Sequence, residues 1–190
     1  MSANGFTVLE LLAVMSILGI LLMLVTPSIK SMIDKQQVRG ACESIYQNMA
    51  LARSSAVSLN KKVTFSFRSS NAGATWCVGL SDGAACNCYT SAASCRVNGI
   101  QRTANSADFG KVDSEGKSSI KVTGIGSDTS VAFDPRDASP DILPDTALVR
   151  SNTWACAISI RVLGQVKYLT EGSGTTRRAI VPLAEAGALN

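Results

Sequence analysis

The chain has 190 residues and a formal net charge of +4, which allows one globular domain with an accessory segment and does not by itself indicate a nucleic-acid partner. It contains no histidine, which removes the commonest general base, the usual serine and cysteine triads, and most zinc ligand sets. We therefore expect a protein that is not an enzyme and that holds neither a metal nor a cofactor.

A short polar leader, residues 1–5, precedes an almost wholly apolar segment, residues 6–25. At about 1.5 Å per residue this segment forms a helix about 30 Å long, which matches the hydrocarbon thickness of a bilayer. A secretory signal peptide would place a basic region before its apolar run and small residues at a cleavage site after it. Here the polar stretch ends at Gly5, before the apolar run, so we predict a transmembrane helix over residues 6–26.

Glu10 is the one charged residue in this apolar segment. A carboxylate at the centre of a membrane helix costs about 2.5 to 3.5 kcal/mol, and less near the helix end. A plain anchor would gain nothing from it, so an ionisable residue here indicates a function and requires a partner. The natural partner is the α-amino group of a neighbouring subunit, exposed when the chain is cut after Gly5.

The stretch Gly5-Phe6-Thr7-Val8-Leu9-Glu10 resembles the class III signal of type IV pilins and type II secretion pseudopilins. The resemblance implies cleavage between Gly5 and Phe6 by a prepilin peptidase, which would also N-methylate Phe6. It implies that Glu10 is the glutamate of filament assembly. Gly19 and Pro27 stand where pilins commonly carry a helix-loosening glycine and proline.

The leader departs from the pilin pattern because it contains no lysine or arginine. The first basic residues, Lys30 and Lys35, follow the apolar segment, which the positive-inside rule would associate with the opposite orientation. The expected orientation, with the globular domain in the periplasm, therefore rests on the motif.

An amphipathic helical segment is predicted over residues 27–60, after Pro27 kinks or locally loosens the helix. Apolar residues recur there at spacings near three and four, which predicts a stripe facing a core. The stripe consists of Ile29, Ile33, Ala41, Ile45, Met49, Ala52, Ala56 and Leu59. We expect one continuous helix running to about Leu59, half in the membrane and half under a sheet.

Beyond residue 60, short alternating runs are broken by Gly, Ser, Asn and Asp, a texture typical of strands and turns. The predicted strands are residues 63–67, 76–80, 119–122, 130–133, 157–162 and 165–169. Gly164 lies between the last two, which predicts a hairpin or a strand bent at a bulge. The fold class is therefore α+β: a long N-terminal helix packed on an antiparallel sheet, with a β-rich head over residues 61–190.

A narrower resemblance is carried by four stretches, which together look like the GspH/FimT family of minor pilins and minor pseudopilins. They are residues 51–57 (LARSSAV), 63–65 (VTF), 76–79 (WCVG) and 133–136 (FDPR). The resemblance extends to about Leu169, and the cysteine-rich residues 81–98 read as an insertion.

Six cysteines behind a membrane-targeting segment favour disulfides formed in an oxidising compartment such as the periplasm. They are Cys42, Cys77, Cys86, Cys88, Cys95 and Cys156. A metal site is disfavoured, because Cys86 and Cys88 form CxC without a second pair at finger-like spacing. Six cysteines allow 15 full pairings; we expect Cys77 to pair with Cys95 or Cys156, and Cys86 or Cys88 with a loop partner.

Two groups of acidic residues read as loop and turn features. The first group has no histidine or paired carboxylate in view. The second group raises calcium as an alternative, but it lacks the glycine and bidentate glutamate spacing of an EF-hand. We expect solvated loop charges at the first group and a turn rich in Asp and Pro at the second. The groups are Asp108, Asp113 and Glu115, and Asp134, Asp137 and Asp141.

DNA binding is an alternative raised by the resemblance, because some FimT-like minor pilins bind DNA through a C-terminal Gly-Arg-x-Arg motif. The nearest stretch here, residues 164–167, keeps one cation, Lys167. Arg161, Arg177 and Arg178 lie close in sequence and are candidate phosphate contacts that would not read base sequence.

Together with these observations, the resemblance implies a minor pilin or pseudopilin. It would be stored in the inner membrane as a single-pass protein and then polymerised into a pilus or pseudopilus. Its expected partners are other pilin or pseudopilin subunits, the prepilin peptidase and the inner-membrane assembly platform. A DNA-uptake receptor at a pilus tip, a type II secretion pseudopilin and an uncleaved membrane-anchored binding module stay open as alternatives.

Overall fold

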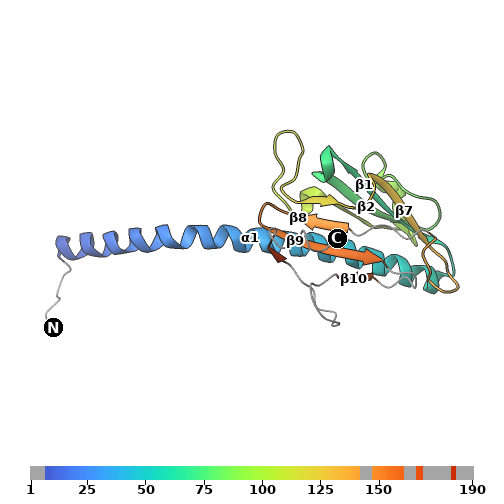
Figure 1. Cartoon of the computed structure of the whole chain (residues 1–190), viewed down its shortest axis with the longest axis horizontal. Coiled ribbons are helices and arrows are strands. Elements are labelled where there is room, and N and C mark those ends of the chain that lie inside the picture. The colour runs from blue at the N-terminus through green and yellow to red at the C-terminus, as the bar shows by residue number, and fades with distance from the viewer. Residues whose placement is uncertain (1–6, 142–146, 161–165, 169–180, 183–190) are drawn as a thin grey trace.

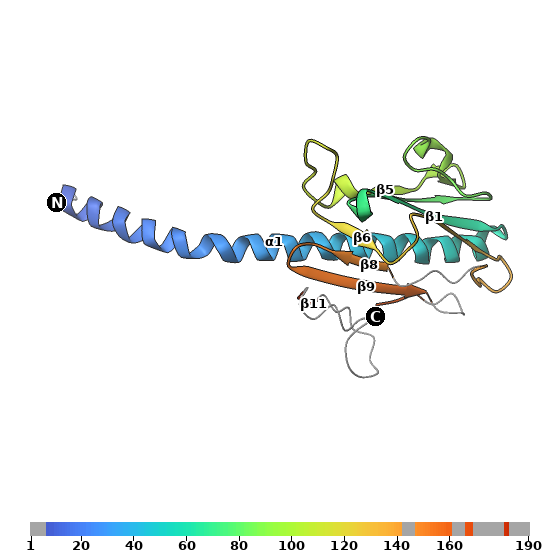
Figure 2. The ribbon, with the colours of Figure 1, turned by 45° about the horizontal axis from the view of Figure 1, so that its top comes forward.

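The computed structural model describes residues 7–141, 147–160, 166–168 and 181–182, and it describes side chains at residues 7–23, 29–141 and 147–158. One long helix runs along the molecule (Figures 1 and 2). Its second half lies beneath a β-rich head, and its first half projects beyond the head. This arrangement confirms the α+β class that the sequence predicts.

The helix α1 (Val8–Leu59) is continuous through Pro27. Thr7 caps its start, and Asn60 ends it in the left-handed conformation, with φ of 49°. The Asn60 N–H donates to the Val57 carbonyl at 3.3 Å, which pairs one of the carbonyl groups that a helix end leaves free. The predicted helix end at Leu59 is confirmed.

The first sheet has the strand order β5-β2-β1-β7, and every neighbouring pair is antiparallel. Its strands are β1 (Val63–Ser70), β2 (Thr75–Ser81), β5 (Thr103–Asn105) and β7 (Asp128–Phe133). A short hairpin, β3 (Arg96–Val97) with β4 (Ile100–Gln101), lies beside it. Single turns of 3-10 helix are η1 (Asn71–Gly73), η2 (Ala92–Ser94) and η3 (Ser106–Asp108).

The second sheet has the order β10-β9-β8-β6, with β11 also pairing with β9. Its strands are β6 (Lys121–Thr123), β8 (Ala147–Arg150), β9 (Trp154–Ile160), β10 (Val166–Tyr168) and β11 (Val181–Pro182). The antiparallel pairing of β9 with β10 agrees with the hairpin expected around Gly164, which itself lies outside the described residues. The sequence did not predict the short strands β3, β4, β5, β8 and β11.

The core lies between the second half of α1 and the inner faces of both sheets. Side chains at helical spacing are fully buried there against apolar residues of β1, β2 and β9. On α1 they are Val38, Ala41, Cys42, Ile45, Met49, Ala52 and Ala56. The expected stripe was wrong at its start, because Ile29 and Ile33, where the helix enters the head, are each 48% exposed.

The strands β1 and β2 are buried on both faces, and the two faces have different partners. Phe65, Phe67 and Trp76 face α1 and belong to the core. Ser66 and Cys77 lie on the opposite face, which the cysteine-rich segment after β2 covers. The two faces follow from the alternation of side chains along a strand.

Candidate functional site

The first half of α1, which the head does not cover (Figure 1), exposes a large apolar surface. Exposed fractions of its large apolar side chains, from Val8 to Met23, run from 47% at Leu18 to 80% at Met23. The hydroxyl of Ser16 interrupts this surface but donates to the Leu12 carbonyl at 2.9 Å within the helix. Soluble monomers rarely expose apolar patches larger than about a few hundred Å². This surface therefore requires an apolar partner, either lipid or other helices.

The expected membrane segment is described from Thr7 to Met23, while Phe6 and the side chains of Leu24 and Val25 lie outside the described residues. Among the described residues, no helix has both the length and the hydropathy needed to cross a bilayer. Gly5 and the rest of the leader also lie outside the described residues, so cleavage and methylation stay predictions.

Thr7 and Glu10 define the start of this surface. The Thr7 hydroxyl accepts a hydrogen bond from the Glu10 N–H at 3.3 Å, and the Thr7 carbonyl accepts one from the Leu11 N–H at 3.2 Å. The exposed Glu10 carboxylate stands in the first turn, where the positive end of the helix dipole favours a negative charge. A carboxylate at this end can meet a cation on a neighbouring molecule, as the expected assembly role of Glu10 requires.

The turn between β8 and β9 ties the head to α1 where the helix enters it. The Thr153 hydroxyl donates to the Asp34 carboxylate at 3.2 Å, and the Trp154 indole N–H donates to the Ser31 hydroxyl at 3.3 Å. The Lys35 Nζ lies 4.6 Å from the centroid of the Trp154 ring, a cation–π distance. Sequence reasoning missed this junction, since its partners lie more than a hundred residues apart.

The disulfide Cys42–Cys156 adds a covalent link deeper in the head. It joins α1 to β9 across 114 residues of sequence, with a Cα–Cα distance of 6.5 Å. Both sulfur-bearing side chains are buried in the core. The head and the second half of α1 therefore form one cross-linked unit.

The cysteine-rich segment is stapled to the outer face of β2 by two further disulfides, Cys77–Cys88 and Cys86–Cys95, with Cα–Cα distances of 6.0 and 5.3 Å. The expected pairing of Cys77 with Cys95 or Cys156 is therefore wrong. Cys156 faces α1 from the second sheet, whereas Cys77 points outward from the first. The expected loop partner exists for Cys86, which pairs with Cys95.

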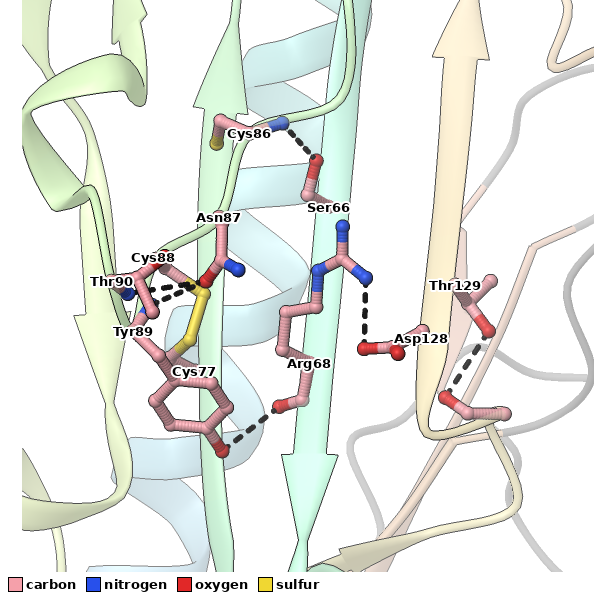
Figure 3. Close-up of polar contacts among 11 residues, drawn as sticks. Ser66, Arg68, Cys77, Cys86, Asn87, Cys88, Tyr89, Thr90, Asp128 and Thr129 are labelled. Carbon is pink, nitrogen blue, oxygen red and sulfur yellow. Dashed lines mark hydrogen bonds and ion pairs between the residues drawn. A yellow bond between two sulfur atoms is a disulfide. The ribbon is translucent and has the colours of Figure 1, made fainter.

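Polar contacts complete this attachment (Figure 3). The Cys86 N–H donates to the Ser66 hydroxyl at 3.0 Å, and the Asn87 side-chain carbonyl accepts from the N–H groups of Tyr89 and Thr90 at 3.0 and 3.2 Å. The sequence marks this segment only by its cysteines, because residues 81–98 otherwise read as a polar loop.

Tyr89 and Arg68 extend the contacts across β1. The Tyr89 hydroxyl donates to the Arg68 carbonyl at 3.4 Å, and the Arg68 guanidinium pairs with Asp128 on β7 at 2.8 Å (Figure 3). Burial raises the pKa of the Tyr89 phenol. These contacts hold the segment against the outer face of the sheet.

The acidic groups serve local structure. Each aspartate after β7 accepts a backbone N–H, and the hydrogen bond from Ser139 lowers the pKa of Asp137. The donors to Asp134, Asp137 and Asp141 are the N–H groups of Arg136, Ser139 and Ala132, at 2.9, 2.9 and 2.8 Å. Among the residues that the structure describes, no group of His, Cys, Asp and Glu could hold a metal ion.

The side chains of the four candidate DNA contacts all lie outside the part of the chain that the structure describes. Arg161, Arg177 and Arg178 lie outside the described residues, and Lys167 is described only by its backbone, which pairs with Ser159. Their role stays a prediction.

Comparison with known proteins identifies the family to which this chain belongs. A family model described as GspH, type II transport protein GspH, matches residues 41–164. Two crystal structures of the type IV minor pilin FimU from Pseudomonas aeruginosa are similar to this chain at 14% identity. One covers 71% of this chain and 90% of FimU with a TM-score of 0.47; the other covers 70% and 92% with a TM-score of 0.43. No curated protein matches this chain.

Proposed function

Because this chain belongs to the GspH family, whose model matches residues 41–164, we propose that it is a minor pilin or pseudopilin that assembles into, or primes, a type IV pilus-type filament. The apolar half of α1 stores the subunit in the inner membrane with its head in the periplasm. A prepilin peptidase then cuts between Gly5 and Phe6 and methylates the new N-terminus. Its role is structural and not catalytic.

The observation that carries this proposal is the continuity of α1. Its first half exposes large apolar side chains from Val8 to Met23, and its second half forms the floor of the head's core. The same apolar surface can contact lipid first and neighbouring helices later. When helices exchange contacts with lipid for contacts with one another, there is little hydrophobic driving force, because lipid tails are as apolar as leucine side chains. A more specific interaction must therefore favour the filament.

Glu10 supplies that interaction. An unpaired carboxylate in an apolar environment is unfavourable, and pairing with an ammonium group removes much of that cost. After cleavage, the amine of Phe6 on a neighbouring subunit provides the cation. The pairing would set the axial position of one α1 relative to the next.

The junction between α1 and the head gives the second element of the mechanism. A head that is cross-linked through Cys42–Cys156 and tied at Trp154 moves with its helix as one body. The position of α1 in the filament therefore sets the position of the head on its surface.

The test is the intact mass and N-terminal residue of the full chain co-expressed with a prepilin peptidase. We expect a product that begins at Phe6 and carries one added methyl group, and we expect Gly5→Ala to abolish the cut. A wild-type product that still begins at Met1 or Ser2 beside an active peptidase would refute the proposal and leave a membrane-anchored binding module.

A further inference from the structure

A basic pocket of about 540 Å³ lies where η1, the loop of residues 109–120 and β6 meet. Three lysines line it, Lys111, Lys117 and Lys121, together with a single carboxylate, Asp113. Asp113 is engaged in shaping the loop, because it accepts the backbone N–H groups of Glu115 and Lys117 at 3.0 and 2.8 Å. The pocket is therefore lined mainly by positive charge, and the N–H groups of Glu115 and Lys117 beside it already donate to Asp113.

The topology places this pocket at the end of the head nearest the apolar half of α1. The chain reverses after Asn60, and β1 carries it back along α1, so η1 and the loop lie at that end (Figure 2). Phe109, at the start of the loop, packs over Gly40 of α1: a Cβ at Gly40 would lie 3.3 Å from the Phe109 ring. The ring also stacks on Trp76 with centroids 5.9 Å apart, which fixes the base of the loop.

The charges at this end of the molecule are predominantly positive. Lys30 and Lys35 follow the apolar segment on α1 and add to the three pocket lysines. Three carboxylates stand against these five lysines: Asp34 accepts from Thr153, Asp113 holds the loop, and Glu115 pairs with Lys117. Of these lysines, Lys30 and Lys35 lie close enough to the apolar segment for the positive-inside rule to apply, and they stand on the side of the membrane where that rule does not place them.

We propose that this basic end of the head, centred on the pocket of Lys111, Lys117 and Lys121, binds the phosphate groups of anionic phospholipids while the subunit is stored in the bilayer. This inference rests on the proposed function, because it requires the apolar half of α1 to lie in lipid. The ligand is a lipid surface, since that surface would lie opposite this end of the head.

The axial distances agree with such a contact. Gly40 lies fifteen residues beyond Val25, about 22 Å along the helix. The headgroup layer extends about 5 to 7 Å beyond the hydrocarbon, and an anionic surface acts over a further 8 to 10 Å or so at physiological salt. The loop and its extended lysine side chains cover the remainder. Extraction of α1 into a filament would break these contacts, so the pocket would hold lipid only in the stored subunit.

The test uses the full chain reconstituted into two kinds of vesicle, phosphatidylcholine alone and phosphatidylcholine mixed with phosphatidylglycerol. A membrane-impermeant amine reagent labels exposed lysines, and mass spectrometry follows each site. We expect anionic vesicles to slow labelling of Lys111, Lys117 and Lys121 about fivefold, a factor typical of one basic residue near an anionic surface, and high salt to restore it. Lys61 and Lys62, exposed at the opposite end, should label equally in both.

A variant gives a second readout. Native mass spectrometry of the detergent-released chain should show fewer bound phosphatidylglycerol molecules for Lys111→Gln/Lys117→Gln/Lys121→Gln than for the control Lys61→Gln/Lys62→Gln. Equal labelling of wild-type loop lysines in both vesicles, with the chain firmly inserted, would overturn the inference and leave the proposed function intact. A chain that alkaline carbonate removes from both vesicles would overturn both. Protection of the loop lysines by added duplex DNA, but not by anionic lipid, would assign the pocket to nucleic acid.

Discussion

Trp154 donates its indole N–H to the hydroxyl of Ser31 across 3.3 Å, so the first residue of β9 is tied to α1 where the helix enters the head. Lys35 lies over the same ring at 4.6 Å. Since the two partners of the hydrogen bond are 123 residues apart in sequence, the contact exists only when the second sheet is folded against the helix. It is therefore a sensitive reporter of the junction between head and helix.

Removing this hydrogen bond should weaken the junction measurably. Trp154→Phe keeps an aromatic ring and removes the donor, and Ser31→Ala removes the acceptor. We expect each to lower the free energy of unfolding by about 0.5 to 1.5 kcal/mol, measured by denaturant titration in mild detergent. The double variant should lose less than the two single losses combined, because both remove the same interaction. Ser54→Ala, whose hydroxyl bonds within α1, is the control, and strictly additive losses would contradict the assignment.

The disulfides should differ in their effect on stability, because they close loops of different length. Cys42–Cys156 spans 114 residues and Cys86–Cys95 spans 9. In the chain-entropy model a loop of about 100 residues is worth about 4.7 kcal/mol and one of about 15 residues about 3 kcal/mol. We expect Cys42→Ala/Cys156→Ala to lower the free energy of unfolding more than Cys86→Ala/Cys95→Ala, by about 2 kcal/mol. Equal losses would show that packing, and not loop closure, sets the contribution.

Gly79 is required by the disulfide above it. A Cβ at Gly79 would lie 2.8 Å from the Cys86 sulfur and closer still to that of Cys95. Gly79→Ala should therefore destabilise the head by about 1 to 3 kcal/mol through overpacking, read from thermal or denaturant unfolding. In the Cys86→Ala/Cys95→Ala background the same substitution should cost much less, because the sulfur atoms are gone. An undiminished cost there would mean that strand strain, and not the disulfide, excludes a side chain.

Much of the fold could be predicted from local patterns. The period of two at β1, β2 and β7 is visible in the sequence, and so is the end of α1 at Leu59, because Asn60 and two lysines follow a regular apolar stripe. The periodicity of apolar residues does not show which element of the fold covers a given face of a helix or strand. Ile29 and Ile33 have the right helical spacing, yet each is 48% exposed where the helix enters the head.

The candidate functional site was likewise predictable only in part. Glu10 could be singled out from the sequence alone, because a carboxylate in an apolar segment is anomalous wherever it lies in the fold. The partners of Cys77, Trp154 and the pocket lysines could not, because they depend on which face of a strand points outward and on how the chain reverses after α1. Such relationships between distant segments are set by tertiary packing and leave no local signal.

Asp137 should make a small acid-sensitive contribution to stability. The hydrogen bond from Ser139 lowers its pKa in the folded protein, so the stabilisation is present above the unfolded pKa, near 4, and is lost as pH falls through the lower folded value. We expect an NMR titration to place the Asp137 midpoint below that of an unfolded peptide. Asp137→Asn should reduce the acid dependence of unfolding in this range, and a midpoint at or above the peptide value would contradict the assignment.

Filament assembly is the prediction with the largest expected effect. Glu10→Gln keeps the size of the side chain and the cap from Thr7, whose hydroxyl bonds to the backbone of residue 10 and not to its carboxylate. It removes only the negative charge, so cleavage and methylation should proceed as in the wild type. Incorporation into sheared or cross-linked filaments, measured by immunoblot against the membrane pool, should fall at least about tenfold, which corresponds to a charge pair worth at least about 1.4 kcal/mol.

Two controls separate charge from shape at Glu10. Glu10→Asp retains the carboxylate and should recover part of the incorporation. Glu115→Gln removes a carboxylate that pairs with Lys117 on the exposed loop, and it should assemble as the wild type does. If Glu10→Gln entered filaments normally, the charge pair with the Phe6 amine could not be the interaction that selects the filament over the membrane. The apolar packing of α1 would then have to supply that selectivity by itself, although lipid satisfies the same surface equally well.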